Sequence, residues 1–313
     1  MEMIINRFEK ELLRAETSVN TIKAYKGDLN KFYDYIKINL GDDVGFEESL
    51  SLIEYKELEE FVFYLEDKEY SRSTINRVIM ALKTFFNYYS KYTGKNPAQG
   101  LKGYKKTNSK IKKVLTKEEV KKIINQTQTK RYGERFVDFN SQRDRFLFAL
   151  LATTGLRIEE ALNIRFRDIE DCGNYKMINI ETHEGSTKLN KRIPVCEKII
   201  PYYDSYMAEY EKKFNITKDG YLIVSPRSGK KIETKVSNAA IKKYCDELEI
   251  EGVTNHCFRH YANIALMSVG TTDVIRKKIL GWSCKGDMGA TVYFHNTKEI
   301  DELMNKYCSM VLE

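Results

Sequence analysis

The chain has 313 residues, of which 42% are hydrophobic and 31% charged, and its formal net charge is +7. This balance is typical of a soluble globular protein with room for two domain cores, and only 4 prolines and 17 glycines argue against a long disordered segment. The longest apolar stretch, residues 146–152, is far shorter than the ~20 residues of a membrane span, and the first residues lack a secretory signal pattern. We therefore expect a cytoplasmic protein.

Six cysteines are scattered along the chain, and no two of them lie within four residues of each other. Zinc sites usually draw their ligands from closely spaced pairs, and disulfides are rare in the cytosol. We therefore expect free thiols and no metal site.

The first hundred residues carry apolar residues at steps of three and four, which is the period of one helix face. The clearest stripe consists of Ile22, Tyr25, Leu29, Phe32 and Ile36, after a polar cap at residues 18–20. A shorter stripe covers 58–65. A third helix, capped by Ser71 or Ser73, must end before Gly94 and Pro97. These patterns predict a helical domain over residues 1–102.

A basic stretch follows, with no acidic residue between positions 101 and 114. It contains Lys102, Lys105, Lys106, Lys110, Lys112 and Lys113. One interpretation is a solvated linker over residues 103–115. The other is a segment that lies along a DNA backbone, where each neutralised phosphate releases counterions.

The second domain, residues 116–313, begins at a capping box in which Thr116 and Glu119 can bond each other's backbone. Helices are predicted across 141–153, from Ile158, and over most of 234–295. Short strands are predicted at 177–181, 192–195 and 221–224. The last helix, 298–311, carries Ile300, Leu303, Tyr307 and Val311 on one face.

Three short motifs in this domain carry possible chemistry. Gly155 precedes Arg157, and Glu160 lies one helical turn farther on. His256 and Arg259 are again one turn apart, and an arginine fork can grip two phosphate oxygens. Each pair alone is more often a surface ion pair or a structural hydrogen bond, and no single tyrosine among 21 stands out.

Taken together and in order, these residues resemble the tyrosine recombinases, or phage integrases. The family pattern runs Gly-Leu-Arg-x-x-Glu, a hairpin lysine, His-x-x-Arg, Leu-Gly-His/Trp and then a tyrosine. Here it is met at 155–160, 256–259, 280–282 and Tyr293. Residues 21–29 and 96–98 resemble the family's core-binding domain, so the likeness covers nearly the whole chain, which is Xer-like in size.

The resemblance implies a mostly α fold with a small β-sheet. A helical, SAM-like core-binding domain and an α+β catalytic domain would form a C-shaped clamp around DNA. Tyr293 would attack the scissile phosphate and form a 3′-phosphotyrosine, with neither metal nor cofactor. Arg157 and Arg259 would stabilise the charged phosphorane, and His256 would help to accept the tyrosine proton. Trp282 would donate a hydrogen bond, and Glu160 and His260 would support these residues.

Two positions depart from the family pattern. The predicted hairpin has a serine, Ser186, where familiar members carry the lysine that protonates the leaving oxygen. We assign this role to Lys188, with Lys191 second and His183 third. Tyr293 lies farther from Trp282 than the pattern requires, and the extra residues fall in 283–288.

The implied partners are double-stranded DNA with a specific recombination site, three further copies of the chain in a tetramer on two duplexes, and an accessory protein of unknown identity. We expect the helix at 298–311 to dock on a neighbouring protomer. The alternative is that it closes its own domain's core. A DNA-relaxing enzyme of the type IB topoisomerase class and a catalytically silent DNA-binding relative are the rival functions.

Overall fold

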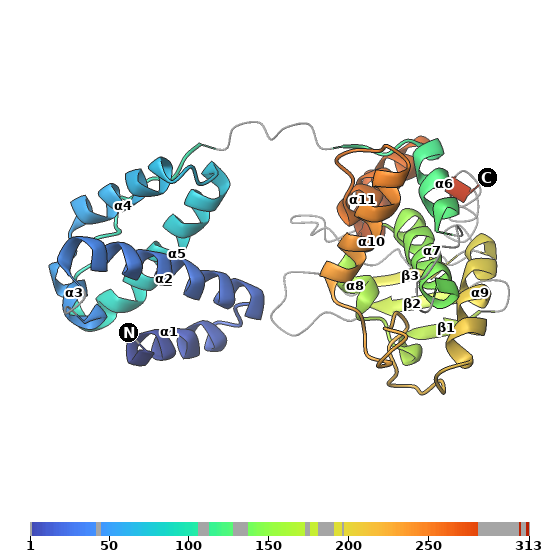
Figure 1. Ribbon diagram of the computed structural model, residues 1–313, viewed down its shortest axis with the longest axis horizontal. Coiled ribbons are helices and arrows are strands. Elements are labelled where there is room, and N and C mark those ends of the chain that lie inside the picture. Colours follow the sequence, from blue (N-terminus) through green and yellow to red (C-terminus); the bar gives the residue numbers. More distant parts are fainter. Residues whose placement is uncertain are drawn as a thin grey trace. The chain divides into compact units, whose positions relative to one another are not determined.

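The computed structural model describes residues 2–41, 45–105, 113–127, 137–172, 176–180, 191–195, 197–280, 307 and 311–312. The chain divides into two compact units, Met1–Ser109 and Lys110–Glu313, and each unit has its own hydrophobic core. The division falls within the linker that the sequence predicts at 103–115. Figure 1 shows the helices and strands of both units, coloured along the sequence.

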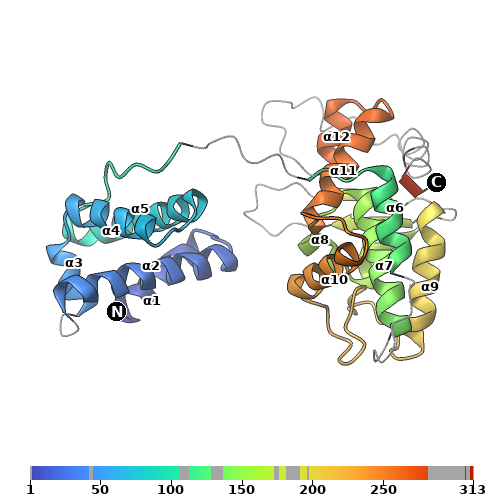
Figure 2. The same cartoon turned by 45° about the horizontal axis from the view of Figure 1, so that its top comes forward.

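The first unit is entirely helical in its described part (Figure 2). Its elements are α1 (Glu2–Arg14), α2 (Val19–Leu40), α3 (Phe46–Leu52), α4 (Tyr55–Asp67) and α5 (Arg72–Thr93). The three predicted helices are α2, α4 and α5. Helices α1 and α3 were not predicted from the sequence.

The ends of these helices follow from local chemistry. The Ser18 and Ser71 side chains accept hydrogen bonds from the third helical amides of α2 and α5, so the cap of α5 is Ser71 and not Ser73. Helix α5 ends at Gly94, whose φ of +70° is a left-handed conformation that glycine adopts without a Cβ penalty.

The second unit surrounds one buried helix. Its helices are α6 (Lys117–Gln126), α7 (Val137–Thr154), α8 (Ile158–Leu162), α9 (Ile200–Glu211), α10 (Thr234–Glu247), α11 (Asn255–Ser268) and α12 (Asp273–Leu280), and its strands are β1 (Ile169–Asp171), β2 (Lys176–Ile180) and β3 (Lys191–Val195). Residues 146–152 of α7 are all buried. Helices α6, α9 and α11 and strand β3 pack against α7 (Figure 1).

The three strands form an antiparallel sheet in the order β1-β2-β3. Strands β2 and β3 confirm the predicted hairpin strands, whereas β1 and α9 were not predicted. The strand predicted at 221–224 is wrong, since only two isolated bridges form there, Arg165 with Tyr221 and Val224 with Lys231. None of the described helices combines the length and the hydrophobicity that a membrane span requires.

Two described residues of the predicted terminal helix lie in the core of the second unit. Tyr307 and Val311 are both fully buried, and the Tyr307 hydroxyl donates to the carbonyl oxygen of Ala152 at 2.7 Å. For these residues, docking on a neighbouring protomer is wrong and the alternative, closure of the chain's own core, holds. A buried ring with a satisfied hydroxyl stabilises its own domain without a partner.

We predict that the C-terminal segment around Tyr307, called the tail below, contributes to the stability of the second unit. Tyr307→Ala should lower its free energy of unfolding by about 3–5 kcal/mol, and Tyr307→Phe, which loses only the hydroxyl, by about 1–2 kcal/mol. Urea denaturation of the full chain measures both losses. Tyr92→Ala is the control, because 74% of that side chain is exposed. An unchanged free energy in Tyr307→Ala would place the tail outside this core.

Candidate active site

The first site arginine, Arg157, is the N-cap of α8. Its backbone N–H donates to Glu160 Oε2 at 2.7 Å, and its Nη1 lies 3.0 Å from Glu160 Oε1. One carboxylate therefore holds both the backbone and the guanidinium of the same residue. This confirms the predicted one-turn pair, and a third of the Arg157 side chain stays exposed to meet a ligand.

The second site arginine, Arg259, is only 3% exposed. Its Nη1 donates to the carbonyl oxygen of Gly155 at 2.7 Å, and its Nη2 donates to the carbonyl oxygen of Leu280. Burial, and to a smaller degree the nearby charge of Arg157, lower the pKa of Arg259 to about 10, and the charge of Glu160 partly opposes both effects. The two arginines therefore share one neighbourhood. A bound anion there would offset both the desolvation of Arg259 and its repulsion by Arg157.

Gly155 makes this arrangement possible. Its φ is +62°, and a Cβ there would lie 2.5 Å from Leu280 Cδ2 and 3.1 Å from Ala262 Cβ. Only glycine satisfies both the backbone conformation and the space. The turn directs the Gly155 carbonyl to Arg259 and starts the extended backbone that leads to Arg157.

His256 and His260 lie on the first two turns of α11. Their rings meet edge to face with centroids 4.5 Å apart. His256 is exposed, His260 is half-buried, and Arg259 follows His256 by one turn. The amino end of a helix favours negative charge, so the exposed imidazole stands where an anion is stabilised.

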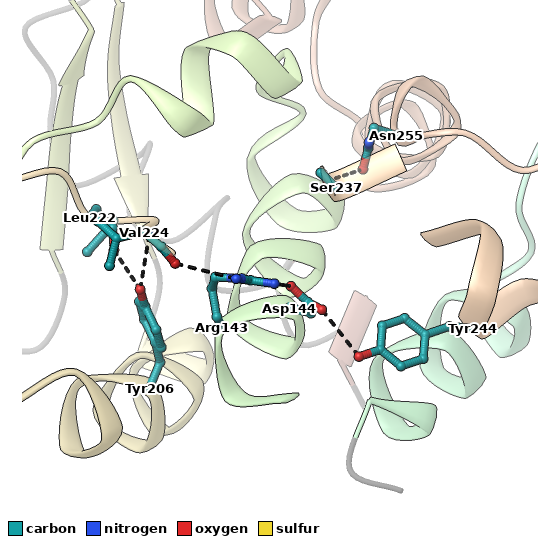
Figure 3. A network of polar contacts seen from close by, with 8 residues as sticks. All are labelled: Arg143, Asp144, Tyr206, Leu222, Val224, Ser237, Tyr244 and Asn255. Atoms are coloured by element: carbon teal, nitrogen blue, oxygen red, sulfur yellow. Dashed lines mark hydrogen bonds and ion pairs between the residues drawn. The ribbon is translucent and has the colours of Figure 1, made fainter. Parts of the chain in front are cut away.

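Figure 3 shows a buried polar network in the second unit. The Arg143 guanidinium donates to Asp144 Oδ1 at 2.7 and 2.9 Å, and the Tyr244 hydroxyl donates to Asp144 Oδ2 at 3.2 Å. Arg143 Nη1 also donates to the carbonyl oxygen of Val224. The network joins α7 to α10 and to the segment after α9. The network was not predicted from the sequence, although the adjacent opposite charges of Arg143 and Asp144, on the same helix as the apolar stretch 146–152, were a visible signal.

Several predicted site residues lie outside the described residues. These are Lys188, Trp282 and Tyr293, together with the third-choice acid His183 and the linker residues Lys106, Lys110 and Lys112. The backbone of Lys191 pairs with Ile180 at the end of the β2–β3 hairpin, which is the place that the sequence predicts.

The described linker lysines differ in their surroundings. Lys102 and Lys105 are exposed, next to a segment held by Asn76, whose side chain bonds both the N–H and the carbonyl of Tyr104 at 2.7 and 3.0 Å. Lys113 instead pairs with Glu119 at 2.6 Å. Lys102 and Lys105 are therefore better placed than Lys113 to meet a phosphate.

Comparison with known families gives two matches that together span most of the chain. A model of the phage integrase family matches residues 113–299, and a model of the N-terminal SAM-like domain of phage integrases matches residues 5–91.

Individual relatives match over nearly their whole length. A tyrosine recombinase of Thermosipho africanus is 27% identical, with 90% of this chain and 91% of that protein covered. Tyrosine recombinase XerD of Staphylococcus saprophyticus is 25% identical, with 98% and 99% covered.

Two solved structures share the fold. One is the XerH site-specific recombinase bound to palindromic difH substrate, with a TM-score of 0.66, 19% identity, and 92% of this chain and 80% of that chain covered. The other is a lambda integrase dimer bound to a COC′ core site, with a TM-score of 0.63, 16% identity, and 90% and 94% covered.

We predict that Gly155→Ala costs more stability than a positive φ alone. The substitution should lower the free energy of unfolding of the second unit by about 2–5 kcal/mol, because strain in φ adds to a clash with Leu280. Gly252→Ala is the matched control, since its φ is +72° but its nearest neighbour is 3.7 Å away; it should cost only about 1–2 kcal/mol. Equal losses of unfolding free energy in the two variants, measured by urea denaturation, would show that the clash with Leu280 adds nothing to the cost of the positive φ.

Proposed function

Because this chain belongs to the phage integrase family and is a site-specific tyrosine recombinase, we propose that it cuts DNA with Tyr293 and holds the scissile phosphate between Arg157 and Arg259. The observation that carries this proposal is the shared neighbourhood of the two arginines. A guanidinium that is already desolvated and fixed by two carbonyl oxygens needs little reorganisation when phosphate charge develops.

The proposed reaction is a transesterification. The Tyr293 oxygen attacks phosphorus, the bond to the 5′ oxygen breaks, and Lys188 gives that oxygen a proton. The released 5′-hydroxyl of one strand then attacks the phosphotyrosine of the other, which restores a phosphodiester and frees the tyrosine. The bond energy is kept in the intermediate, and the charge of the phosphorane is stabilised by the two arginines.

The remaining residues have assisting roles in this proposal. His256 hydrogen-bonds the phosphate and helps to take the phenol proton, because a phenol with a pKa of ~10 is a weak nucleophile near neutral pH. His260 supports the His256 ring, as their 4.5 Å contact suggests, and Glu160 orients Arg157. Trp282 donates a hydrogen bond but cannot transfer a proton.

We propose that both units contact the duplex and that the exposed lysines Lys102 and Lys105 neutralise phosphates of its backbone. Four copies would assemble on two recombination sites in the cytoplasm, with an accessory protein as a further candidate partner. Resolution of DNA dimers and integration or excision of a mobile element are both candidate roles for this reaction.

We expect Tyr293→Phe to abolish the covalent adduct on a nicked suicide substrate, with an unchanged binding affinity, because only the attacking oxygen is lost. Denaturing gels detect the adduct and a mobility-shift assay measures affinity. Tyr92→Phe should keep the adduct, since Tyr92 is an exposed residue of the helical unit. An adduct that persists in Tyr293→Phe would place the nucleophile elsewhere, and relaxation of supercoils without regard to sequence would favour the topoisomerase reading.

The choice of general acid has its own test. Lys188→Ala should slow cleavage of a normal strand by about 10²–10⁴-fold. A substrate with sulfur at the 5′ bridging position should restore the rate, because a thiolate leaves without a proton. Lys191→Ala is the control and should show neither effect. Rescue by sulfur in Lys191→Ala, and not in Lys188→Ala, would move the role to Lys191.

A further inference from the structure

The first turns of α10 contact both helices that carry the site. Thr234 donates to the carboxylate of Glu159 on α8, two residues after Arg157. Ser237 Oγ donates to Asn255 Oδ1 at the start of α11 at 3.1 Å (Figure 3). Asn255 Nδ2 in turn donates to Asn238 Oδ1 at 2.7 Å. Helix α10 is therefore a shared support for α8 and α11.

The two contacts differ in strength because they differ in burial. The Thr234–Glu159 bond is exposed, where water competes with it. Asn255 is 4% exposed and Ser237 is fully buried, so each would leave a desolvated polar group behind if the other were removed. The amide of Asn255 is the strong link between α10 and α11.

The start of α11 is held by its N-cap as well as by Asn255. Thr254 and Cys257 form a capping box, in which the Thr254 N–H donates to Cys257 Sγ at 3.3 Å and the Thr254 hydroxyl lies 3.6 Å from the same sulfur. Sulfur is a weak hydrogen-bonding partner. The amide of Asn255 supplies the stronger hydrogen bonds of this turn, and they join it to α10.

His256 is the next residue in the chain and shares that turn. Arg259 is fixed separately, by the carbonyl oxygens of Gly155 and Leu280. A change at Asn255 should therefore displace the imidazole of His256 and leave the grip of Arg259 on the phosphate in place.

We propose that Asn255 is the positioning residue for His256, and that Ser237 and Asn238 hold its amide in the orientation that this requires. The inference rests on the proposed function, because it assigns Asn255 to the cleavage step. It predicts a loss in the rate of cleavage and not in the affinity for DNA.

The test measures single-turnover cleavage of a suicide substrate at saturating full-length protein. Asn255→Ala should cleave about 10- to 100-fold more slowly, since small displacements of a reacting group have effects of this size. Its affinity for DNA should stay within about threefold, because phosphate contacts dominate binding. Asn255→Asp, which keeps an acceptor for Ser237, should retain more of the rate than Asn255→Ala.

A double-mutant cycle shows whether Asn255 acts through His256. In a His256→Ala background, Asn255→Ala should slow cleavage by less than about twofold further, since residues that act as one unit are not additive. Asn263→Ala, two turns along the same helix, controls for the loss of an asparagine and should cleave normally.

Three results would overturn the inference. These are a wild-type rate in Asn255→Ala, a full additional loss in the His256→Ala background, or a loss explained by the unfolded fraction measured by circular dichroism at the assay temperature. If the wild-type protein forms no tyrosyl adduct at all, the proposed function itself fails, which is a different outcome.

Discussion

The buried guanidinium of Arg259 joins three segments that are far apart in the sequence, namely the turn after α7, helix α11 and the end of α12. Its two carbonyl partners are backbone atoms, so the bonds fix the path of the chain as well as the side chain. The turn at Gly155 and the close packing of Leu280 against it follow from this arrangement. Arg157 directly follows the same turn. The contacts that fix this turn therefore position both arginines.

This arrangement has an energetic cost. A charged group removed from water and set beside a like charge destabilises the folded unit, which is why the pKa of Arg259 falls to about 10. The surrounding core, built on the buried face of α7, holds the strained arrangement in place. A phosphate diester would supply the missing negative charge. The burial of Arg259 and its closeness to Arg157, which destabilise the free unit, would therefore favour the complex with DNA.

Much of the local structure could be predicted because its causes are local. Ser18, Ser71 and Thr116 cap helices as their positions indicate, and Arg157 pairs with Glu160 at one-turn spacing. The strand predicted at 221–224 does not form because of a tertiary contact, which the local sequence pattern cannot reveal. The hydroxyl of Tyr206 accepts from the Val224 N–H and donates to the Leu222 carbonyl, so a side chain from α9 replaces the neighbouring strand. Asn255 was missed likewise, because its importance comes from Ser237 and Asn238 on another helix.

The burial of Tyr307 also has a consequence for the reach of the proposed nucleophile, Tyr293. Leu280 is held by Arg259, and Tyr307 is held by Ala152, so the chain between them is tethered at both ends to one unit. Tyr293 lies near its middle, since 293 − 280 is 13 and 307 − 293 is 14. Even fully extended, 13 residues span only about 45 Å. In the proposed reaction, a tether of this length would give Tyr293 an effective concentration at the phosphate on the order of millimolar. Most of the entropy lost in bringing that tyrosine to the phosphate would then be lost already when the domain folds.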